Sequence, residues 1–245
     1  LAGRVLERQG DLPAAAVTPL ADATILAPIP RPRKNVFAIG LNYVAHNKEF
    51  TSQDTMPSHP IVFTKAPTSV VGPGDDVVIR PDLSDQNDYE GELAVVIGTG
   101  GSDIAPEDAE AHIFGYVIVN DVTARDLQKR TSQWFMGKTL DTFCPMGPYL
   151  VHKSEVGWPV RLNVRTTING EVRQDSNTEN LYFDIPSLIA TVSAGVTLEP
   201  GDVIATGTPE GVGMAFDPPK FLRDGDEMVV EIEKLGVLRN RVRAG

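Results

Sequence analysis

The sequence predicts an α+β fold that is rich in β-strands and has few, short helices. Short runs of β-branched and aliphatic residues recur along the chain, bounded by glycine, proline, asparagine or aspartate. The Asn169-Gly170 pair that follows one of them is the best hairpin signal in the chain. Because these runs do not alternate regularly with long helical patterns, a doubly wound sheet is not expected.

Composition narrows the class of protein and its partners. A chain of 245 residues can bury a sizeable core, and 41% hydrophobic with 22% charged residues is ordinary for a globular protein. The net charge of −11 disfavours nucleic-acid and membrane surfaces, which need clustered Lys and Arg. Cys144 is the single cysteine, so neither an internal disulfide nor a thiolate zinc site is expected. No apolar run has the length of a membrane span, and the opening residues lack a signal-peptide core, so we expect a cytoplasmic protein.

We expect two parts, a small N-terminal piece with its linker, residues 1–33, and a main domain, residues 34–245. The first part is rich in Ala and Pro and ends in a stiff proline-rich connector. A polar loop is expected at 51–60. Strands are expected at 36–40, 61–65, 76–79, 93–97, 114–119, 160–168, 202–205 and 227–233. Helices are expected at 42–50, 103–112 and 185–196.

Two carboxylates mark the start of the most apolar strand. Glu90 and Glu92 precede the run 93–97, and in an extended strand their side chains point to the same side. Two adjacent carboxylates at the mouth of a buried strand repel each other unless a cation holds them. The alternative is a pair on a solvated strand face, which is common.

Asp121 adds a third carboxylate at the end of the predicted strand 114–119. Three oxygen ligands without Cys or His suit a hard cation such as Mg²⁺ or Mn²⁺, with water or substrate in the remaining positions. The alternative is that Asp121 caps the turn that follows it.

His46 and Glu49 lie three residues apart and therefore on one face of the predicted helix 42–50. A carboxylate beside an imidazole fixes its tautomer and raises its basicity, which makes a base that can activate water. The spacing equally fits an exposed helical pair.

Several further residues are suited to binding an anion. Lys138 lies in a segment of small and apolar residues, where it is either a counter-charge for an enolate or a surface lysine. Arg125 and Gln128 are suited to bind a carboxylate of the substrate. Arg125 could equally be a structural ion-pair partner. The turn Gly207–Gly213 is neither a P-loop nor a dinucleotide fingerprint, and it offers backbone N–H groups and the Thr208 hydroxyl to an anion. Cys144 is best interpreted as a buried thiol.

Together these motifs resemble those of the fumarylacetoacetate hydrolase superfamily, in the family's order and approximate spacing. The resemblance covers about Arg33 to Val242 and is closest to the subgroup related to fumarylacetoacetate hydrolase domain-containing protein 2. The motifs that carry it are Asn42-Tyr43-x-x-His46-x-x-Glu49, Glu90-x-Glu92-Leu93, Asn120-Asp121-Val122-Thr123-Ala124-Arg125-Asp126, Gly137-Lys138-Thr139 and Thr206-Gly207-Thr208-Pro209-Glu210-Gly211-Val212-Gly213.

The resemblance implies a fold of stacked and rolled mixed β-sheets, a homodimer, and one Mg²⁺ or Mn²⁺ per subunit, with Ca²⁺ able to replace it in crystals. Glu90, Glu92 and Asp121 would hold the metal. His46 and Glu49 would form a water-activating pair on a mobile lid. Lys138 would be the third catalytic residue. Arg125, Gln128, Gly207 and Thr208 would bind the substrate. Residues 1–33 would be a trimmed remnant of a longer N-terminal domain.

The expected activity is hydrolysis of a carbon–carbon bond in a β-diketo acid of the acylpyruvate, fumarylpyruvate or fumarylacetoacetate type, as in aromatic catabolism. The substrate would be chelated as an enolate, with water activated by the His46/Glu49 pair. The same site would serve an isomerase, tautomerase or decarboxylase acting on 2-hydroxyhepta-2,4-diene-1,7-dioate or oxaloacetate. A third possibility is a non-catalytic metal-binding β-protein.

Overall fold

The computed structural model describes residue 19, residues 22–50 and residues 56–245. Most of the predicted N-terminal piece 1–33 and half of the predicted polar loop 51–60 lie outside these ranges. Of the described N-terminal residues, Ala27 is buried in an apolar cluster with residues of the large sheet, such as Val36. The domain boundary after residue 33 stays a prediction.

Seven strands form a mixed sheet in the order β2-β1-β12-β6-β7-β9-β3. Near its centre β6 pairs antiparallel with both β12 and β7, while β1 runs parallel to β12. The strands are β1 (Val36–Gly40), β2 (Ile61–Lys65), β3 (Val70–Val71), β6 (Gly91–Ile97), β7 (Ile113–Asn120), β9 (Cys144–His152) and β12 (Val203–Ala205).

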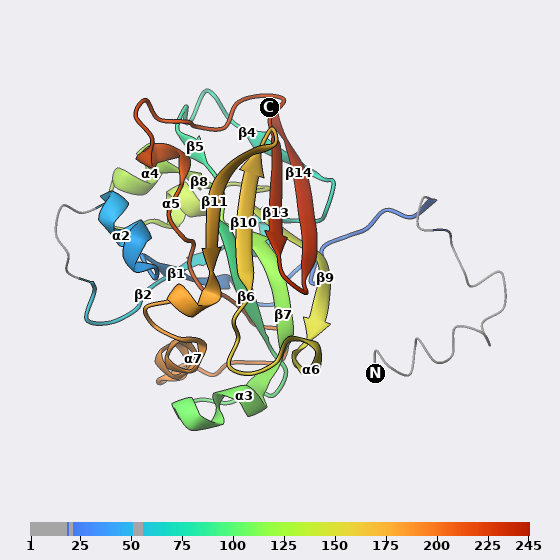
Figure 1. Cartoon of the computed structure of the whole chain (residues 1–245), viewed down its shortest axis with the longest axis vertical. Helices are drawn as coiled ribbons and strands as arrows, with labels where there is room; N and C mark the ends of the chain where they lie inside the picture. The colour runs from blue at the N-terminus through green and yellow to red at the C-terminus, as the bar shows by residue number, and fades with distance from the viewer. Residues whose placement is uncertain (1–18, 20–21, 51–55) are drawn as a thin grey trace.

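A five-stranded sheet has the order β11-β10-β13-β14-β4. Its strands are β4 (Asp76–Ile79), β10 (Asn163–Ile168), β11 (Glu171–Asn177), β13 (Glu227–Ile232) and β14 (Gly236–Ala244). The predicted hairpin is confirmed: Asn169 and Gly170 join β10 to β11 with φ of 52° and 79°, the positive values that a type I′ turn needs. Figure 1 shows β10, β11, β13 and β14 side by side, with β6 and β7 behind them.

The core lies on both faces of the large sheet. Leu93 and Val95 of β6 join an apolar cluster with residues of the five-stranded sheet, such as Val230. Ala94 and Val96, which alternate with them, join a second cluster on the opposite face. All seven residues of β6 are buried, so the expectation that this apolar run forms a buried strand is confirmed. Cys144 is buried in the second cluster, and burial raises the pKa of its thiol to about 12.

The helices are short. They are α2 (Val44–Phe50), α3 (Ala109–His112), α4 (Arg125–Lys129), α5 (Phe135–Lys138), α6 (Lys153–Val156) and α7 (Ile185–Ser193). Single turns of 3-10 helix lie at η4 (Pro67–Ser69), η5 (Pro106–Asp108), η6 (Thr178–Asn180) and η7 (Gly213–Ala215). In Figure 1, α2, α4 and α5 gather on one side of the sheets, together with β5 (Asn87–Asp88) and β8 (Thr123–Ala124), whereas α3, α6 and α7 lie near the far end. In the described part of the chain no helix is long and apolar enough to cross a membrane.

Several predicted boundaries differ from the structure, and three of them differ by three residues. The helix expected from Asp103 begins at Pro106, because Asp103 has φ of 52° and its carboxylate accepts a hydrogen bond from Gly195 N. The strand expected from residue 160 begins at Asn163, and the helix expected to reach residue 196 ends at Ser193. Strands β9 and β14 were not predicted, because prolines interrupt the first and charged residues alternate along the second.

Candidate active site

Two paired strand ends bring the three predicted metal ligands together. Glu90 immediately precedes β6, Glu92 is the second residue of that strand, and Asp121 immediately follows β7. Because Gly91 pairs with Asn120, the two strand ends lie side by side. The Asp121 N–H donates to the Glu90 carbonyl oxygen at 2.8 Å, and Asn120 Oδ1 accepts from Glu90 N at 3.0 Å.

The carboxylates of Glu90, Glu92 and Asp121 are buried, and each offers an oxygen within 4.8 Å of the others. The alternative of a solvated strand face is therefore wrong. The carboxylate of Asp121 takes part in no cap of the next turn, because its two oxygens accept from lysines. The geometry suits one shared cation.

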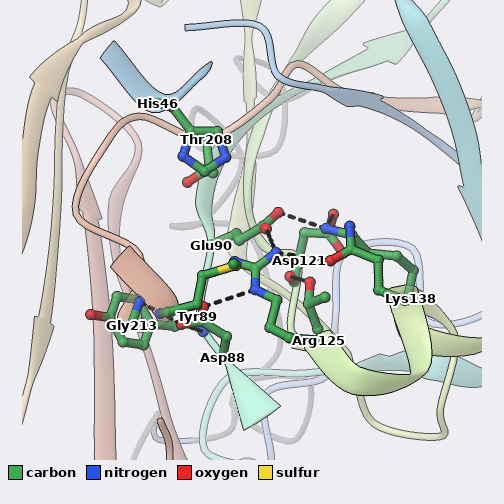
Figure 2. A network of polar contacts seen from close by, with 12 residues as sticks. His46, Asp88, Tyr89, Glu90, Asp121, Arg125, Lys138, Thr208 and Gly213 are labelled. Carbon is green, nitrogen blue, oxygen red and sulfur yellow. Dashed lines mark hydrogen bonds and ion pairs between the residues drawn. The ribbon is translucent and has the colours of Figure 1, made fainter. Parts of the chain in front are cut away.

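Three buried cationic side chains surround two members of this carboxylate triad. Lys138 Nζ lies 2.7 Å from both Glu90 Oε2 and Asp121 Oδ2, and Lys65 Nζ lies 2.5 Å from Asp121 Oδ1. Arg125 Nη1 lies 2.6 Å from Glu90 Oε1. Figure 2 shows Glu90 between Lys138 and Arg125, joined to both. Lys138 is thus not a surface lysine.

Glu92 is in a different electrostatic position. Its Oε2 accepts from Gly207 N at 2.9 Å, and no ion pair with it is found among the described residues. Burial, and then the charges of Asp121 and Glu90, raise the pKa of Glu92 well above its usual range. Burial would also raise the pKa of Glu90, but Lys138, Arg125 and His46 hold that pKa below its usual range.

The residues of this site fit a divalent cation. The carboxylates buried there outnumber the cationic side chains, which leaves one negative charge unmatched in the described structure. The carboxylates are Asp88, Glu90, Glu92 and Asp121, and the cations are Lys65, Arg125 and Lys138. Hard oxygen donors prefer Mg²⁺, Mn²⁺ or Ca²⁺. An ion held by the triad would compensate Glu92 and leave a surplus positive charge for an anionic ligand.

The predicted pair on α2 is formed, with His46 buried and Glu49 partly buried. His46 Nδ1 lies 2.8 Å from Glu49 Oε2, and His46 is only 3% exposed, so the alternative of an exposed helical pair is wrong. Glu49 Oε1 also accepts from Gly211 N at 2.7 Å, which ties α2 to the glycine-rich turn. Mobility of α2 as a lid stays a prediction.

The turn Gly207–Gly213 places carboxylates. Its first six residues adopt neither helix nor strand, as predicted. However, the expectation of free N–H groups is wrong at three positions: Gly207 N donates to Glu92, Gly211 N to Glu49 and Gly213 N to Asp88. Substrate binding by Gly207 therefore stays a prediction, and its visible role is to orient Glu92.

Thr208 and Gln174 lock the same turn to the sheets. The Thr208 hydroxyl donates to the Gly91 carbonyl oxygen at 3.0 Å and accepts from Gln174 Nε2 at 2.7 Å. Gln174 Oε1 in turn accepts from Gly91 N. A Cβ on Gly91 would lie 2.2 Å from Thr166 Oγ1, so the residue between the two glutamates has to be glycine for the sheets to approach this closely.

Arg125 is held by a carboxylate that sequence reasoning missed. Asp88 Oδ2 lies 2.9 Å from Arg125 Nε, and the Asp88 carboxylate also accepts from Gly213 N and Met214 N. Arg125 is therefore a structural ion-pair partner and also lines the pocket described next. Gln128 Oε1 accepts from Arg125 Nη1 at 3.3 Å.

One pocket, of about 90 Å³, collects most of the predicted site residues. His46, Glu90, Arg125, Gln128, Lys138 and Thr208 line it, and so do Ile39, Gly40, Leu41, Lys129 and Trp134. The other predicted residues do not line the pocket but contact residues of the site. Glu49 pairs with His46, Gly207 N donates to Glu92, and Glu92 and Asp121 complete the triad with Glu90.

Sequence reasoning missed Lys65, Asp88, Lys129 and Trp134. A signal existed for Asp88, because Asp88, Glu90 and Glu92 alternate along one extended segment. Lys65 ends an ordinary short strand, and nothing in its neighbours indicates that it is buried against Asp121.

Comparisons with known proteins agree with this geometry. The family model "Fumarylacetoacetate (FAA) hydrolase C-terminal" matches residues 35–243. The chain is 55% identical over 223 residues to oxaloacetate tautomerase YisK of Bacillus subtilis, which covers 91% of this chain and 74% of that protein. It is 50% identical over 228 residues to the human mitochondrial oxaloacetate tautomerase FAHD2A, covering 92% of this chain and 71% of that protein.

A solved structure shows the same fold. Fumarylacetoacetate hydrolase from psychrophilic Exiguobacterium antarcticum superposes with a TM-score of 0.82 at 50% identity, over 90% of this chain and 78% of that chain. The predicted fold class, β-rich α+β with mixed curled sheets, is thereby confirmed. With a family model that matches nearly all of the main domain, the chain belongs to the fumarylacetoacetate hydrolase family.

Proposed function

We propose that this chain is a divalent-metal-dependent tautomerase that interconverts the keto and enol forms of a small 2-keto acid such as oxaloacetate. The observation that carries the proposal is that buried His46, which lines the pocket, is paired with Glu49 beside the acidic triad. The relatives named oxaloacetate tautomerase, at 50–55% identity, supply the reaction class.

The metal would be held by Glu90, Glu92 and Asp121. Bound there, Mg²⁺ or Mn²⁺ would supply electrostatic stabilisation for negative charge on the keto oxygen of the substrate. Glu92 is oriented for this role by Gly207 N, and Glu90 and Asp121 by the backbone pairing of their strand ends.

His46 is suited to move the proton that distinguishes keto from enol. Glu49 accepts from Nδ1, so exchange with a substrate falls to Nε2. In the proposed step, Nε2 takes a proton from the carbon next to the keto group. The electrons of the broken C–H bond form the carbon–carbon double bond, and the π electrons of the carbonyl group move onto the keto oxygen. A proton from water, or the one now held by His46, completes the enol, and the reverse sequence restores the ketone.

Lys138 is suited to stabilise the oxygen on which charge develops. Its ammonium group is buried at the edge of the triad and lines the pocket. Burial would lower the pKa of Lys138, but Asp121 and Glu90 raise it above its usual value, so the group stays charged. A fixed ammonium in a water-poor site favours an enolate oxygen over a neutral carbonyl oxygen.

Hydrolysis of an acylpyruvate-type bond is the second candidate. It is supported by the name of the Exiguobacterium antarcticum structure, a fumarylacetoacetate hydrolase. It would use His46 to activate water instead of exchanging a substrate proton. The names of the relatives favour tautomerisation, or the isomerisation named for the 2-hydroxyhepta-2,4-diene-1,7-dioate isomerase of Mycobacterium marinum, at 38% identity. A non-catalytic role is disfavoured because the close relatives are enzymes.

A side-by-side assay tests the proposal. The chain, supplied with Mg²⁺, would be given the enol of oxaloacetate and, separately, an acylpyruvate. We expect the enol absorbance to fall faster than it does without protein, while CO2 release does not keep pace with that loss. We also expect no acid product from cleavage of the acylpyruvate. Cleavage of the acylpyruvate with unchanged enol exchange would establish the hydrolase instead, and CO2 release matched to enol loss would establish a decarboxylase.

The choice between Mg²⁺ and Mn²⁺ and the homodimeric assembly belong to the same proposal. The donor set of the triad supports the proposal of Mg²⁺ or Mn²⁺, and membership of the family supports the proposal of a dimer. Light scattering of the purified chain would test the dimer, and enol exchange after dialysis against chelator and addition of each ion would rank the metals. A monomer with full activity would remove the dimer from the proposal.

A further inference from the structure

The cationic groups of the pocket are not equivalent. Lys138 and Arg125 line the pocket but are buried, and each already pairs with two carboxylates of the chain. Lys129 also lines the pocket, yet it is exposed, and the described residues place no carboxylate within ion-pair distance of its ammonium group. Among the described residues its charge therefore stays available to a ligand or to water.

Helix α4 sets Lys129 at the mouth of the pocket. Arg125 and Lys129 are four residues apart, so their side chains lie on one face of the helix, about 6 Å apart along its axis. Along this face the exposed fraction rises from 1% at Arg125 and 6% at Gln128 to the exposed Lys129. Arg125 contacts the triad through Glu90, so Lys129 lies one helical turn further out.

Trp134 lines the same pocket and is held in place by packing. Its ring packs so tightly on Gly40 that a Cβ there would lie 2.3 Å from the indole. It also packs edge-on against Phe63, with ring centroids 5.5 Å apart. Trp134 and Lys129 line the same pocket of about 90 Å³ as Glu90 of the triad, so a ligand anchored at the triad lies in a small space that Lys129 also borders.

We propose that Lys129 binds the distal carboxylate of the substrate and so selects dicarboxylic over monocarboxylic 2-keto acids. This inference rests on the proposed function, because it assumes that the keto-acid end of the ligand lies at the triad. The ammonium group of an exposed lysine is hydrated and screened by salt, so the pair contributes modestly. We expect removal of the charge to weaken dicarboxylate binding about threefold to tenfold at low ionic strength.

Binding of two ligands that differ by one carboxylate tests the inference. Oxaloacetate and pyruvate would be titrated into Mg²⁺-loaded protein, read by calorimetry or by quenching of tryptophan fluorescence. Lys129→Met keeps the aliphatic stem and removes the charge, and Lys129→Arg keeps the charge. Arg130→Ala is the matched control, because Arg130 is the next residue, is exposed and does not line the pocket.

The inference requires a selective result. Lys129→Met should weaken oxaloacetate binding about threefold to tenfold and leave pyruvate binding unchanged, with Lys129→Arg and Arg130→Ala close to the wild type. Equal loss for both ligands, or no loss for either, would overturn the role of Lys129 while enol exchange by the wild type still supported the proposed function. A wild type that neither binds oxaloacetate nor exchanges its enol would overturn both.

Discussion

The ammonium group of Lys138 lies 2.7 Å from Oε2 of Glu90, inside the candidate metal centre. Lys138 also reaches Asp121, so it shares carboxylate oxygens with any ion that the triad holds. A carboxylate oxygen has two lone pairs and can serve both partners, but the two positive charges repel each other. The lysine therefore has opposite effects on metal affinity and on the charge of a bound substrate.

Replacing Lys138 should separate these effects. We expect Lys138→Met to bind Mg²⁺ about tenfold more tightly, because the repelling charge is gone, while enol exchange falls about a hundredfold. Calorimetric titration with Mg²⁺ and an enol-exchange assay at saturating Mg²⁺ would measure the two quantities. If metal affinity fell together with activity, Lys138 would be organising the triad instead of competing with the ion.

The contact between Glu49 and His46 should govern proton transfer. Glu49→Gln keeps the shape but removes the charge that stabilises protonated His46, so we expect kcat to fall about tenfold to a hundredfold with little change in KM. Steady-state measurements of kcat and KM for the variant and the wild type would show this. Glu107→Gln, on an exposed 3-10 turn, serves as the control and should match the wild type.

Gly211 should be needed to keep the glycine-rich turn against the sheet. It has φ of 96°, and a Cβ there would lie 1.9 Å from the Arg173 carbonyl oxygen. Gly170 has φ of 79° with open space around it, so Gly170→Ala carries the backbone penalty alone. We expect Gly211→Ala to lower the melting temperature more than Gly170→Ala does. We also expect Gly211→Ala to reduce activity, because Gly211 N donates a hydrogen bond to Glu49. Equal behaviour of the two variants would show that the close approach is not required.

Glu92 should make the metal-free protein less stable at higher pH. Its pKa in the folded state is raised above that of the unfolded chain, so the folded state binds the extra proton in the window between the two values. Stability from this group is present below that window and is lost as pH rises through it. In Glu92→Gln the loss is absent, so the melting temperature of the variant minus that of the wild type, measured with chelator, should grow as pH rises.

Chain length sets how a change in free energy of unfolding converts into a change in melting temperature. For a domain of this size each 1 kcal/mol corresponds to about 2–4 °C in melting temperature. Addition of Mg²⁺ should reverse the order, since an ion needs the charged carboxylate of Glu92 and stabilises only the protein that can bind it. A difference that stays constant with pH would mean that Glu92 is paired in a way that its surroundings do not indicate.

Local patterns predicted the elements on which the site is built. Strand β6 was recognisable from its unbroken apolar run, and the hairpin from Asn169-Gly170. The alternation of side chains along a strand predicts that Glu90 and Glu92 lie close together. Their approach to Asp121 depends on the pairing of β6 with β7, which no local sequence pattern predicts. The resemblance to a family supplied that step.

Other parts of the site were beyond sequence reasoning because they depend on distant packing. Lys65 looks like the last residue of an ordinary strand, and only the fold brings it to Asp121, 56 positions later. Trp134 forms a wall of the pocket because Gly40 lets its ring approach. The N–H groups of Gly207 and Gly211 were expected to bind an anionic ligand and instead bind two carboxylates of the chain, because strand pairing and α2 deliver those side chains to the turn.

Calorimetric titration of the chelator-treated protein with Mg²⁺ tests the central claim most directly. The account predicts one ion per chain for the wild type, with affinity at least tenfold weaker in Glu92→Gln and unchanged in the surface control Glu107→Gln. Binding of Mg²⁺ to Glu92→Gln with the affinity of the wild type, or no binding to the wild type, would contradict a metal centre formed by Glu90, Glu92 and Asp121.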